Sequence, residues 1–147
     1  MSYIILRDKS VLDIHNPRIG IDDIAHSLSM QCRFNGHVPK FYSVAEHSVL
    51  VSKMVENLDA LLHDAAEAII GDIVTPLKDA KVCKLESKIL GSLGITISEK
   101  IKLADADMLI REMDQFYFGR DRGIKCLDPS SAKNLFLDRW EELNEKA

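Results

Sequence analysis

The chain has 147 residues, of which 46% are hydrophobic and 29% are charged, and this balance is typical of one soluble globular domain spanning residues 1–147. The formal net charge of −4 leaves no surplus of lysine and arginine, which disfavours a DNA or RNA partner and leaves a small phosphorylated ligand open. No apolar run reaches the roughly 18 residues that a membrane span needs, and the N-terminus lacks the layout of a signal peptide, so we expect a cytoplasmic protein without a membrane partner.

Helical signals dominate the first half of the chain. Two adjacent aspartates predict a short helix over residues 22–28. An irregular stretch follows over residues 33–42, where glycine and proline interrupt regular structure. Ser43 and Glu46 then have the S-x-x-E spacing of a capping box, which predicts a helix from Ser43 to about Glu56.

Helices are also predicted for most of the second half. Asp59 is expected to open a mostly buried helix that ends at Gly71. Further helices are predicted over residues 84–93 and 98–118, and a last one begins at Asp128, which proline follows. The side chains expected to face inward in the last two helices are Ile101, Ala104, Met108, Leu109, Leu135, Phe136, Trp140 and Leu143. Because no strand signal longer than residues 3–6 competes, the predicted fold is an all-α helical bundle.

Three ionisable residues interrupt the apolar segment LLHDAAEAII. In a helix, His63 and Glu67 lie four residues apart on one face, with Asp64 one position further round. Burying such groups without partners costs several kcal/mol, and a divalent cation is the simplest compensating charge. The alternative is that His63 is a hydrogen-bonded core histidine and that both carboxylates face water.

Two more residues fit a cation site. His47 lies on the neighbouring predicted helix and can meet His63 across a packed helix pair. Asp105 is flanked at helical spacing by apolar residues, so it is expected to point inward. Asp107 has Arg111 four residues on, which is the pattern of a solvated ion pair and makes it the weaker candidate.

Taken in order, these residues resemble a known superfamily. A histidine, then His-Asp, then a lone aspartate about forty residues later is similar to the HD-domain phosphohydrolases. The segments AHSLSMQCRFNGHVPKFYSVAEHSVLVS, ALLHDAAEAIIGDIVTP and IKLADADML resemble those of bacterial 5'-deoxynucleotidases and of short phage-type dATP triphosphohydrolases. The resemblance covers about residues 22 to 115. It implies a single-domain helical bundle of the HD type whose metal ligands are His47, His63, Asp64 and Asp105.

The ligand types restrict the metal. Mixed imidazole and carboxylate ligation without thiolates suits one divalent transition metal, namely Mn²⁺, Co²⁺, Fe²⁺, Ni²⁺ or Zn²⁺, with Mg²⁺ possible at the phosphates of the substrate. Such a site serves hydrolysis by polarising a phosphoryl group and activating water.

The resemblance also implies roles for other residues. Glu67 and Asp72 match the family's catalytic acidic pair. The alternative favoured for Glu67 is support for a ligand histidine, and Asp72 is equally interpretable as a turn residue. Arg33 matches the arginine that precedes the first metal histidine and is expected to hold phosphate. Further substrate-binding candidates, each with an ordinary surface role as its alternative, are His37, Lys40 and Lys78. One of Phe34, Phe41 and Tyr42 can stack on a base, although a place in the core is the commoner role for such aromatic residues.

The function expected from the resemblance is metal-dependent hydrolysis of deoxynucleotides. The first expectation is a triphosphohydrolase that converts a dNTP, specifically dATP, into a deoxynucleoside and triphosphate. The alternatives are a 5'-deoxynucleotidase acting on a dNMP and a non-catalytic nucleotide-binding helical module. The expected partners are a small nucleotide and further copies of the chain in a homo-oligomer.

Overall fold

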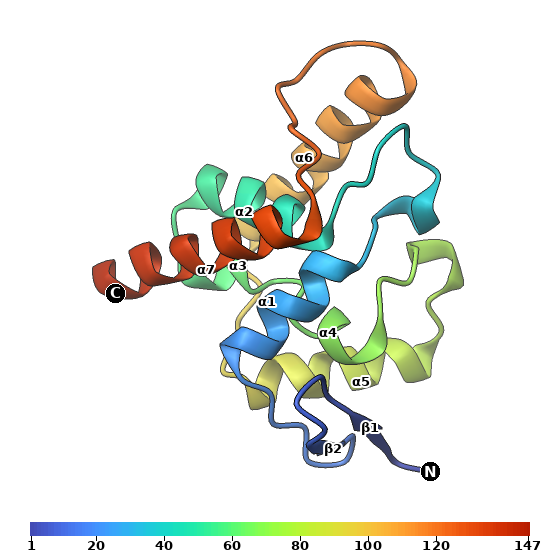
Figure 1. Cartoon of the computed structure of the whole chain (residues 1–147), viewed down its shortest axis with the longest axis vertical. Helices are drawn as coiled ribbons and strands as arrows, with labels where there is room; N and C mark the ends of the chain where they lie inside the picture. Colours follow the sequence, from blue (N-terminus) through green and yellow to red (C-terminus); the bar gives the residue numbers. More distant parts are fainter.

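Helices make up most of the computed structural model, which describes residues 1–147 (Figure 1). In chain order the elements are β1 (Tyr3–Ile5), β2 (Val11–Asp13), α1 (Ile21–Met30), α2 (Val44–Val55), α3 (Leu58–Leu61), α4 (Glu67–Ile70), α5 (Ala80–Ser92), α6 (Glu99–Tyr117) and α7 (Pro129–Lys146). Two 3-10 turns, η1 (Phe34–Gly36) and η2 (Thr75–Leu77), lie in the connections. The predicted helical fold is therefore confirmed. None of the helices combines the length and the apolar character needed to cross a membrane.

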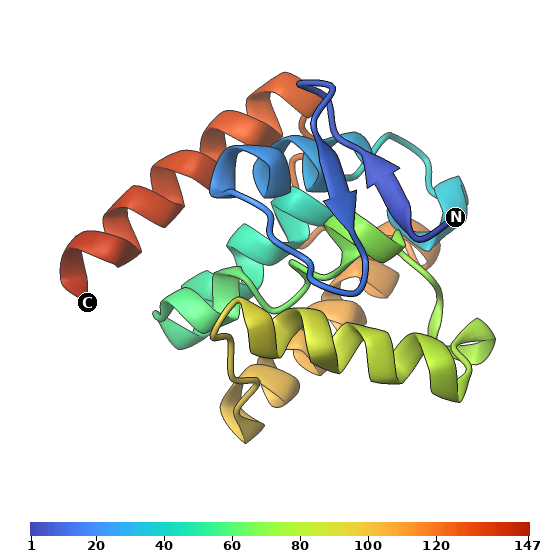
Figure 2. The same cartoon turned by 90° about the horizontal axis from the view of Figure 1, so that it is seen from below.

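The one departure from an all-helical chain is a small hairpin. β1 and β2 pair antiparallel, with Ile4 opposite Leu12. The hairpin lies at one end of the molecule (Figure 1) and is in front in the view from that end (Figure 2); Arg7 after β1 pairs with Asp23 of α1 at 3.1 Å. Only Leu12 of this hairpin is fully buried, so the hairpin adds little to the core.

Side-chain caps fix where the helices begin. Ser43, Ser98 and Asp128 each accept a hydrogen bond from the backbone N–H three residues later, which confirms the predicted starts of α2, α6 and α7. Asn57 caps α3, so the prediction that Asp59 opens that helix is wrong by two positions. Asp79 caps α5, which starts before the predicted residue 84.

The predicted continuous helix from Asp59 to Gly71 is broken into α3 and α4. Between them the backbone bonds connect residues three apart, as from Ala65 N–H to the Leu62 carbonyl at 2.9 Å. The physical reason lies at His63, whose Nδ1 donates to the Ala60 carbonyl at 2.7 Å. In a continuous helix that carbonyl would accept the amide of Asp64 instead. His63 and Asp64 therefore lie in a turn between two short helices.

Two hydrophobic clusters lie on either side of α2. The larger joins α1, α2, α5 and α7, with Leu28, Val49 and Phe136 fully buried. The smaller joins α2 to α6 and includes Ile101 and Met108. Leu109, expected to face inward, is 39% exposed because it lies one position further round the helix than Met108.

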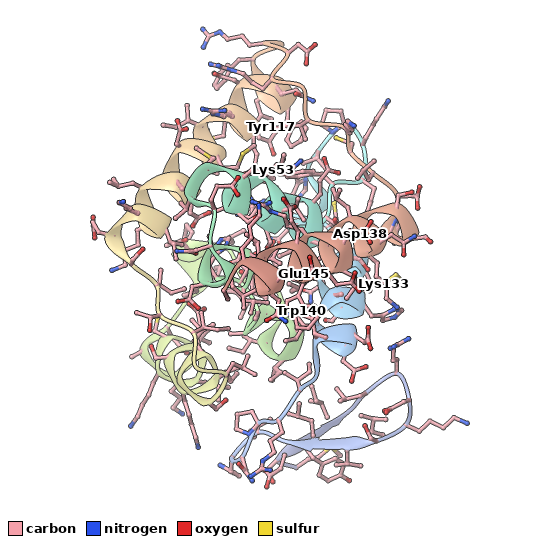
Figure 3. The ribbon with its side chains drawn as sticks, turned by 90° about the vertical axis from the view of Figure 1, so that its left-hand side faces the viewer. Lys53, Tyr117, Lys133, Asp138, Trp140 and Glu145 are labelled. Carbon is pink, nitrogen blue, oxygen red and sulfur yellow. The ribbon has the colours of Figure 1, made fainter.

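The last helix covers the larger cluster with one face. Phe136 and Leu143 are buried as predicted, whereas Leu135 and Trp140 are only half-buried at the edge of the cluster. Figure 3 shows α7 from its outer side, with Asp138 and Glu145 exposed on that side. The amphipathic pattern thus identifies the buried face correctly and overestimates its width.

Glu46 does not complete the capping box. Ser43 accepts the Glu46 amide at 3.0 Å, but the Glu46 carboxylate turns away from Ser43. It accepts instead from the backbone N–H groups of Lys125, Cys126 and Leu127, at 3.2, 3.2 and 2.6 Å. Since Glu46 is 2% exposed, this carboxylate fastens the connection between α6 and α7 to the first turn of α2.

Replacing Glu46 with alanine is expected to lower the free energy of unfolding by about 2–4 kcal/mol, because it leaves three backbone donors without their acceptor. Asp107→Ala, which removes an exposed ion pair with Arg111, is the control and should cost less than about 0.5 kcal/mol. Denaturant unfolding followed by circular dichroism measures both. Equal losses for the two variants would contradict the anchoring role of Glu46.

Candidate metal centre

Two histidines and two aspartates from three parts of the chain converge. His47 comes from α2 and is fully buried, His63 and Asp64 come from the turn after α3, and Asp105 comes from α6. The Nε2 atom of His47 lies 3.0 Å from Asp105 Oδ1 and 3.6 Å from Asp64 Oδ2. The Nε2 atom of His63 lies 3.2 Å from Asp64 Oδ2 and 3.6 Å from Asp105 Oδ1. The side chain of Asp105 is 45% exposed, so the cluster is open to solvent on that side.

In each histidine, Nε2 is the inner nitrogen, which faces the cluster, and Nδ1 is the outer one. The hydrogen bond of Nδ1 determines whether Nε2 carries a proton or a free lone pair. The Nδ1 atom of His47 lies 2.7 Å from a carboxylate oxygen of Glu112, and that of His63 lies 2.7 Å from the Ala60 carbonyl. Because both partners accept hydrogen bonds, both Nδ1 atoms carry the proton, and in the neutral rings both Nε2 atoms present lone pairs. His63 Nε2 is buried and has no hydrogen-bond partner. With neutral rings four acceptors thus meet without a donor between them, whereas a protonated His47 donates from Nε2 to Asp105.

Such a cluster needs a positive charge at its centre. Burial acts to lower the pKa of His63, but Asp64 and Asp105 raise it well above 6.5 overall. Burial and Arg33 act to lower the pKa of His47, yet Glu112 and Asp105 raise it. Burial acts to raise the pKa of Asp64, and the adjacent His63 lowers it to about 2. Either protons on the rings or a bound cation can supply the charge.

The ligand atoms of His47, His63 and Asp64 all lie within 4.8 Å of one another, so this group could hold a metal ion. The unpartnered nitrogen of His63 and the mixture of imidazole and carboxylate donors fit a divalent transition metal. Asp105 faces the same centre. Asp107 pairs with Arg111 at 3.0 Å on the exposed side of α6, as predicted.

Glu112 is a central residue that the sequence analysis missed. It is fully buried and accepts hydrogen bonds from His47 Nδ1, from the Tyr42 hydroxyl and from Arg33 at 2.9 Å. A carboxylate behind a ligand histidine fixes the orientation of the ring and increases its basicity. A signal was present, because Glu112 lies seven residues after Asp105 and therefore on the same face of α6.

Arg33 is not an ordinary surface arginine. Its side chain is only 12% exposed, and the ion pair with Glu112 raises its pKa although burial acts to lower it. The Nε atom is buried without a partner. The negative charges of Asp64 and Asp72 act on its guanidinium, which places a cation beside the candidate metal ligands.

Glu67 and Asp72 lie beside the metal ligands with perturbed acidity. Burial, with Asp64 and Asp72 nearby, raises the pKa of Glu67 to about 10. Burial also raises the pKa of Asp72. The Oε2 atom of Glu67 is buried and has no hydrogen-bond partner within the chain.

Gln31 fixes the backbone around both acids and was also missed. Its amide nitrogen donates to the Glu67 carbonyl at 2.9 Å, and its amide oxygen accepts the Asp72 N–H at 2.9 Å. A glutamine at the end of α1 carries no local sequence signal for this contact, because its partners are 36 and 41 residues away.

The remaining predicted substrate residues differ in their surroundings. Lys78 pairs with Glu86 at 3.0 Å, and the charges of Glu67 and Asp64 also act on it. His37 and Lys40 are exposed, and neither side chain forms a hydrogen bond or an ion pair, so their contact with a substrate stays a prediction. Among the aromatic candidates Tyr42 is fully buried, and the prediction that it can stack on a base is therefore wrong. Phe34 packs edge-on against Phe116 and Tyr117, and Phe41 is half-buried.

The chain has a relative that covers nearly its whole length. It is 37% identical to YfdR of Escherichia coli over 157 aligned positions, which include 90% of this chain and 88% of YfdR. The chain belongs to the YfdR family. It is also 43% identical over 84 residues to an uncharacterized protein of Rhodobacter capsulatus, a match that covers 47% of this chain and 43% of that protein. No protein-family model matches the chain. Since YfdR is itself an uncharacterized protein, the relationship supplies no activity, and the chemistry must be argued from the site.

Mn²⁺ or Co²⁺ is expected to raise the midpoint of thermal unfolding of the wild-type protein, because a ligand that binds only the folded state stabilises it. Asp64→Ala removes a carboxylate from the cluster and should abolish most of that shift, whereas Asp107→Ala should keep it. Differential scanning fluorimetry after chelator treatment measures the shift. An equal shift in Asp64→Ala and in the wild type would contradict the assignment.

The affinity for the cation is expected to rise with pH and to level off above the raised pKa values of His47 and His63. Below those values a proton occupies the nitrogen that must bind the metal, so binding releases protons. In the cation-free protein the same shifts stabilise the folded state fully below pH 6.5, and this contribution is lost as the pH rises through the raised values. Titration calorimetry in two buffers of different ionisation enthalpy counts the released protons. An affinity for the cation that stays constant as the pH falls toward 6.5 would exclude this linkage.

Proposed function

We propose that the protein is a metal-dependent phosphohydrolase of the HD-domain type that acts on deoxynucleotides. The observation that carries the proposal is the convergence of His47, His63, Asp64 and Asp105, two imidazoles and two carboxylates around one centre, beside an acidic residue of high pKa. Imidazole and carboxylate groups together are the donor set that a divalent transition metal prefers. The exposed side of Asp105 gives a ligand access to the cluster.

A divalent cation bound by these four residues would polarise a phosphoryl oxygen and lower the pKa of water beside it. Other residues of the chain would orient the ligands and transfer protons. His47 and His63 are held in one tautomer by Glu112 and by the Ala60 carbonyl, so their inner nitrogens are oriented before any ligand arrives. This preorganisation lowers the cost of assembling the site.

Glu67 is proposed as the proton-transfer residue. Its raised pKa keeps the carboxyl group protonated at neutral pH, and a nearby positive charge shifts that pKa back toward neutrality. A carboxyl group with a pKa near the working pH can both accept a proton from water and return one to the leaving oxygen. Asp72, held through its backbone by Gln31, is the second member of the pair.

The first substrate that we propose is a deoxynucleoside triphosphate, with dATP as the specific case, and the support is the resemblance of residues 22 to 115 to the phage-type enzymes. In this proposal Arg33 and Lys78 contact the phosphates and the α-phosphorus is attacked. The products are a deoxynucleoside and triphosphate.

A deoxynucleoside monophosphate is the second candidate, and a specific observation favours it. Arg33 and Lys78 are the cations that act most strongly on Glu67, and each already pairs with a glutamate. A monophosphate brings less negative charge into this acidic surrounding than a triphosphate does. The products are then a deoxynucleoside and inorganic phosphate.

The test is a product assay with each dNTP and each dNMP in the presence of Mn²⁺ or Co²⁺, read by chromatography. Wild-type protein is expected to release triphosphate from dATP. Glu67→Gln should lower kcat by roughly 10²–10⁴-fold, because it removes the proton donor and keeps the shape. His63→Ala should lose activity with the metal site, and Asp107→Asn should match the wild type.

The outcomes separate the candidates. Release of phosphate from dNMP alone would replace the triphosphate proposal with the nucleotidase. Metal-dependent binding of nucleotide without turnover, measured by calorimetry, would favour the non-catalytic binding module. Turnover that survives both Glu67→Gln and His63→Ala would refute the proposed site.

A further inference from the structure

A short segment of strained backbone follows Arg33. The next three residues, Phe34, Asn35 and Gly36, have φ angles of 57°, 53° and 80°, all in the left-handed region. Only glycine adopts this conformation without cost, so other contacts have to hold the first two residues in place. Strained residues of this kind gather at functional sites, and these directly follow a candidate phosphate-binding residue.

The contacts that hold this turn come from the end of α6. The ring of Phe34 packs edge-on against Phe116 and Tyr117, with ring centroids 6.3 and 5.9 Å apart. The Tyr117 hydroxyl donates to the His37 carbonyl at 2.5 Å. Phe34 is half-buried and Tyr117, labelled in Figure 3, is 46% exposed. Since neither residue belongs to the two hydrophobic clusters, their contact contributes little to the core.

The turn also brings the ring of Phe34 against the guanidinium of Arg33. In an extended chain the side chains of neighbouring residues point to opposite sides. With the left-handed backbone at Phe34, the centroid of its ring lies 5.1 Å from Arg33 Cζ, within the range of a cation–π interaction. The Nη2 atom of Arg33 donates to Glu112 at 2.9 Å, and the Nε atom has no hydrogen-bond partner. The guanidinium is therefore held on one face and at one edge while donors remain for a ligand.

We propose that Phe34 and Tyr117 are positioning residues that hold the guanidinium of Arg33 where it binds a phosphate group. This inference rests on the phosphate-binding role that the proposed function gives to Arg33. An arginine that is free to rotate loses that freedom when a phosphate binds, whereas one that is already held does not. Because the contacts come from the helix that also carries Asp105, α6 fixes the guanidinium relative to a candidate metal ligand.

The support of His47 does not depend on Phe34. Tyr42 packs against Phe116 with centroids 5.1 Å apart, and its hydroxyl donates to Glu112, which also accepts from His47 Nδ1. Tyr42 is fully buried. Removing the ring of Phe34 is therefore expected to release Arg33 and to leave the binding of a cation intact.

The test is titration calorimetry of inorganic phosphate into the Mn²⁺-loaded protein. Phe34→Ala and Tyr117→Ala should each raise the Kd for phosphate about 3–10-fold, the factor expected when one long side chain has to be ordered on binding. Phe118→Ala, which removes a neighbouring aromatic residue that is 63% exposed, is the control and should match the wild type. All three variants should keep the Mn²⁺-dependent thermal shift, which shows that they are folded and bind the cation.

A double-mutant cycle separates positioning from a general effect on the fold. If Phe34 acts through Arg33, then Phe34→Ala should cause no further loss of phosphate affinity in the Arg33→Ala protein. An equal loss with and without Arg33 would overturn the inference. So would a wild-type protein that binds no phosphate, or an Arg33→Ala, Phe34→Ala or Tyr117→Ala variant that binds phosphate as tightly as the wild type.

Hydrolysis of dATP and dAMP, measured on the same preparations, distinguishes this inference from the proposed function. Where turnover occurs, Phe34→Ala and Tyr117→Ala should raise KM more than they lower kcat, because they weaken binding and leave the metal site and Glu67 in place. Absent turnover, together with phosphate binding that depends on Arg33 and Phe34, would refute the proposed chemistry and support the positioning role.

Discussion

The convergence of two imidazoles and two carboxylates, from His47, His63, Asp64 and Asp105, is the constraint on which the rest of the structure depends. Each of these groups would be satisfied in water, and bringing them together costs the folded chain several kcal/mol unless a positive charge compensates. The fold commits three separate parts of its backbone to this arrangement, from α2, the turn after α3, and α6. Protons on the two rings or a bound cation can supply that charge, and the raised pKa values of His47 and His63 reflect the same demand for it.

Glu112 links this constraint to the segment before α2. It receives the outer proton of His47, the Tyr42 hydroxyl and the Arg33 guanidinium, and these donors together keep its pKa low although burial acts to raise it. The same contacts commit Arg33 partly to a structural role, although a guanidinium has five donors and its Nε atom remains unpartnered. Holding the fold and offering donors to a phosphate are therefore compatible tasks for Arg33.

Local chemistry explains which features were predictable from sequence. Ser43, Ser98 and Asp128 satisfy amides only three residues away, so the starts of their helices could be identified from short patterns. The choice of Asp105 over Asp107 followed from helical periodicity in the same way. The break at His63, the anchoring by Glu46 and the bridge by Gln31 depend on tertiary partners or on a side chain that displaces a backbone bond. Helical period could have indicated Glu112, but not the histidine that it supports.

Helix α6 carries two of the groups on which the site depends. Asp105 and Glu112 leave its inner face at positions two turns apart, so a small rotation of the helix would displace a candidate ligand and the support of another together. Within the chain, α6 is held mainly by its contact with α2 and by the hydrogen bonds of Glu112. The order of the site therefore depends on the contact between α2 and α6, because the two helices supply His47 and its support from opposite sides of that contact.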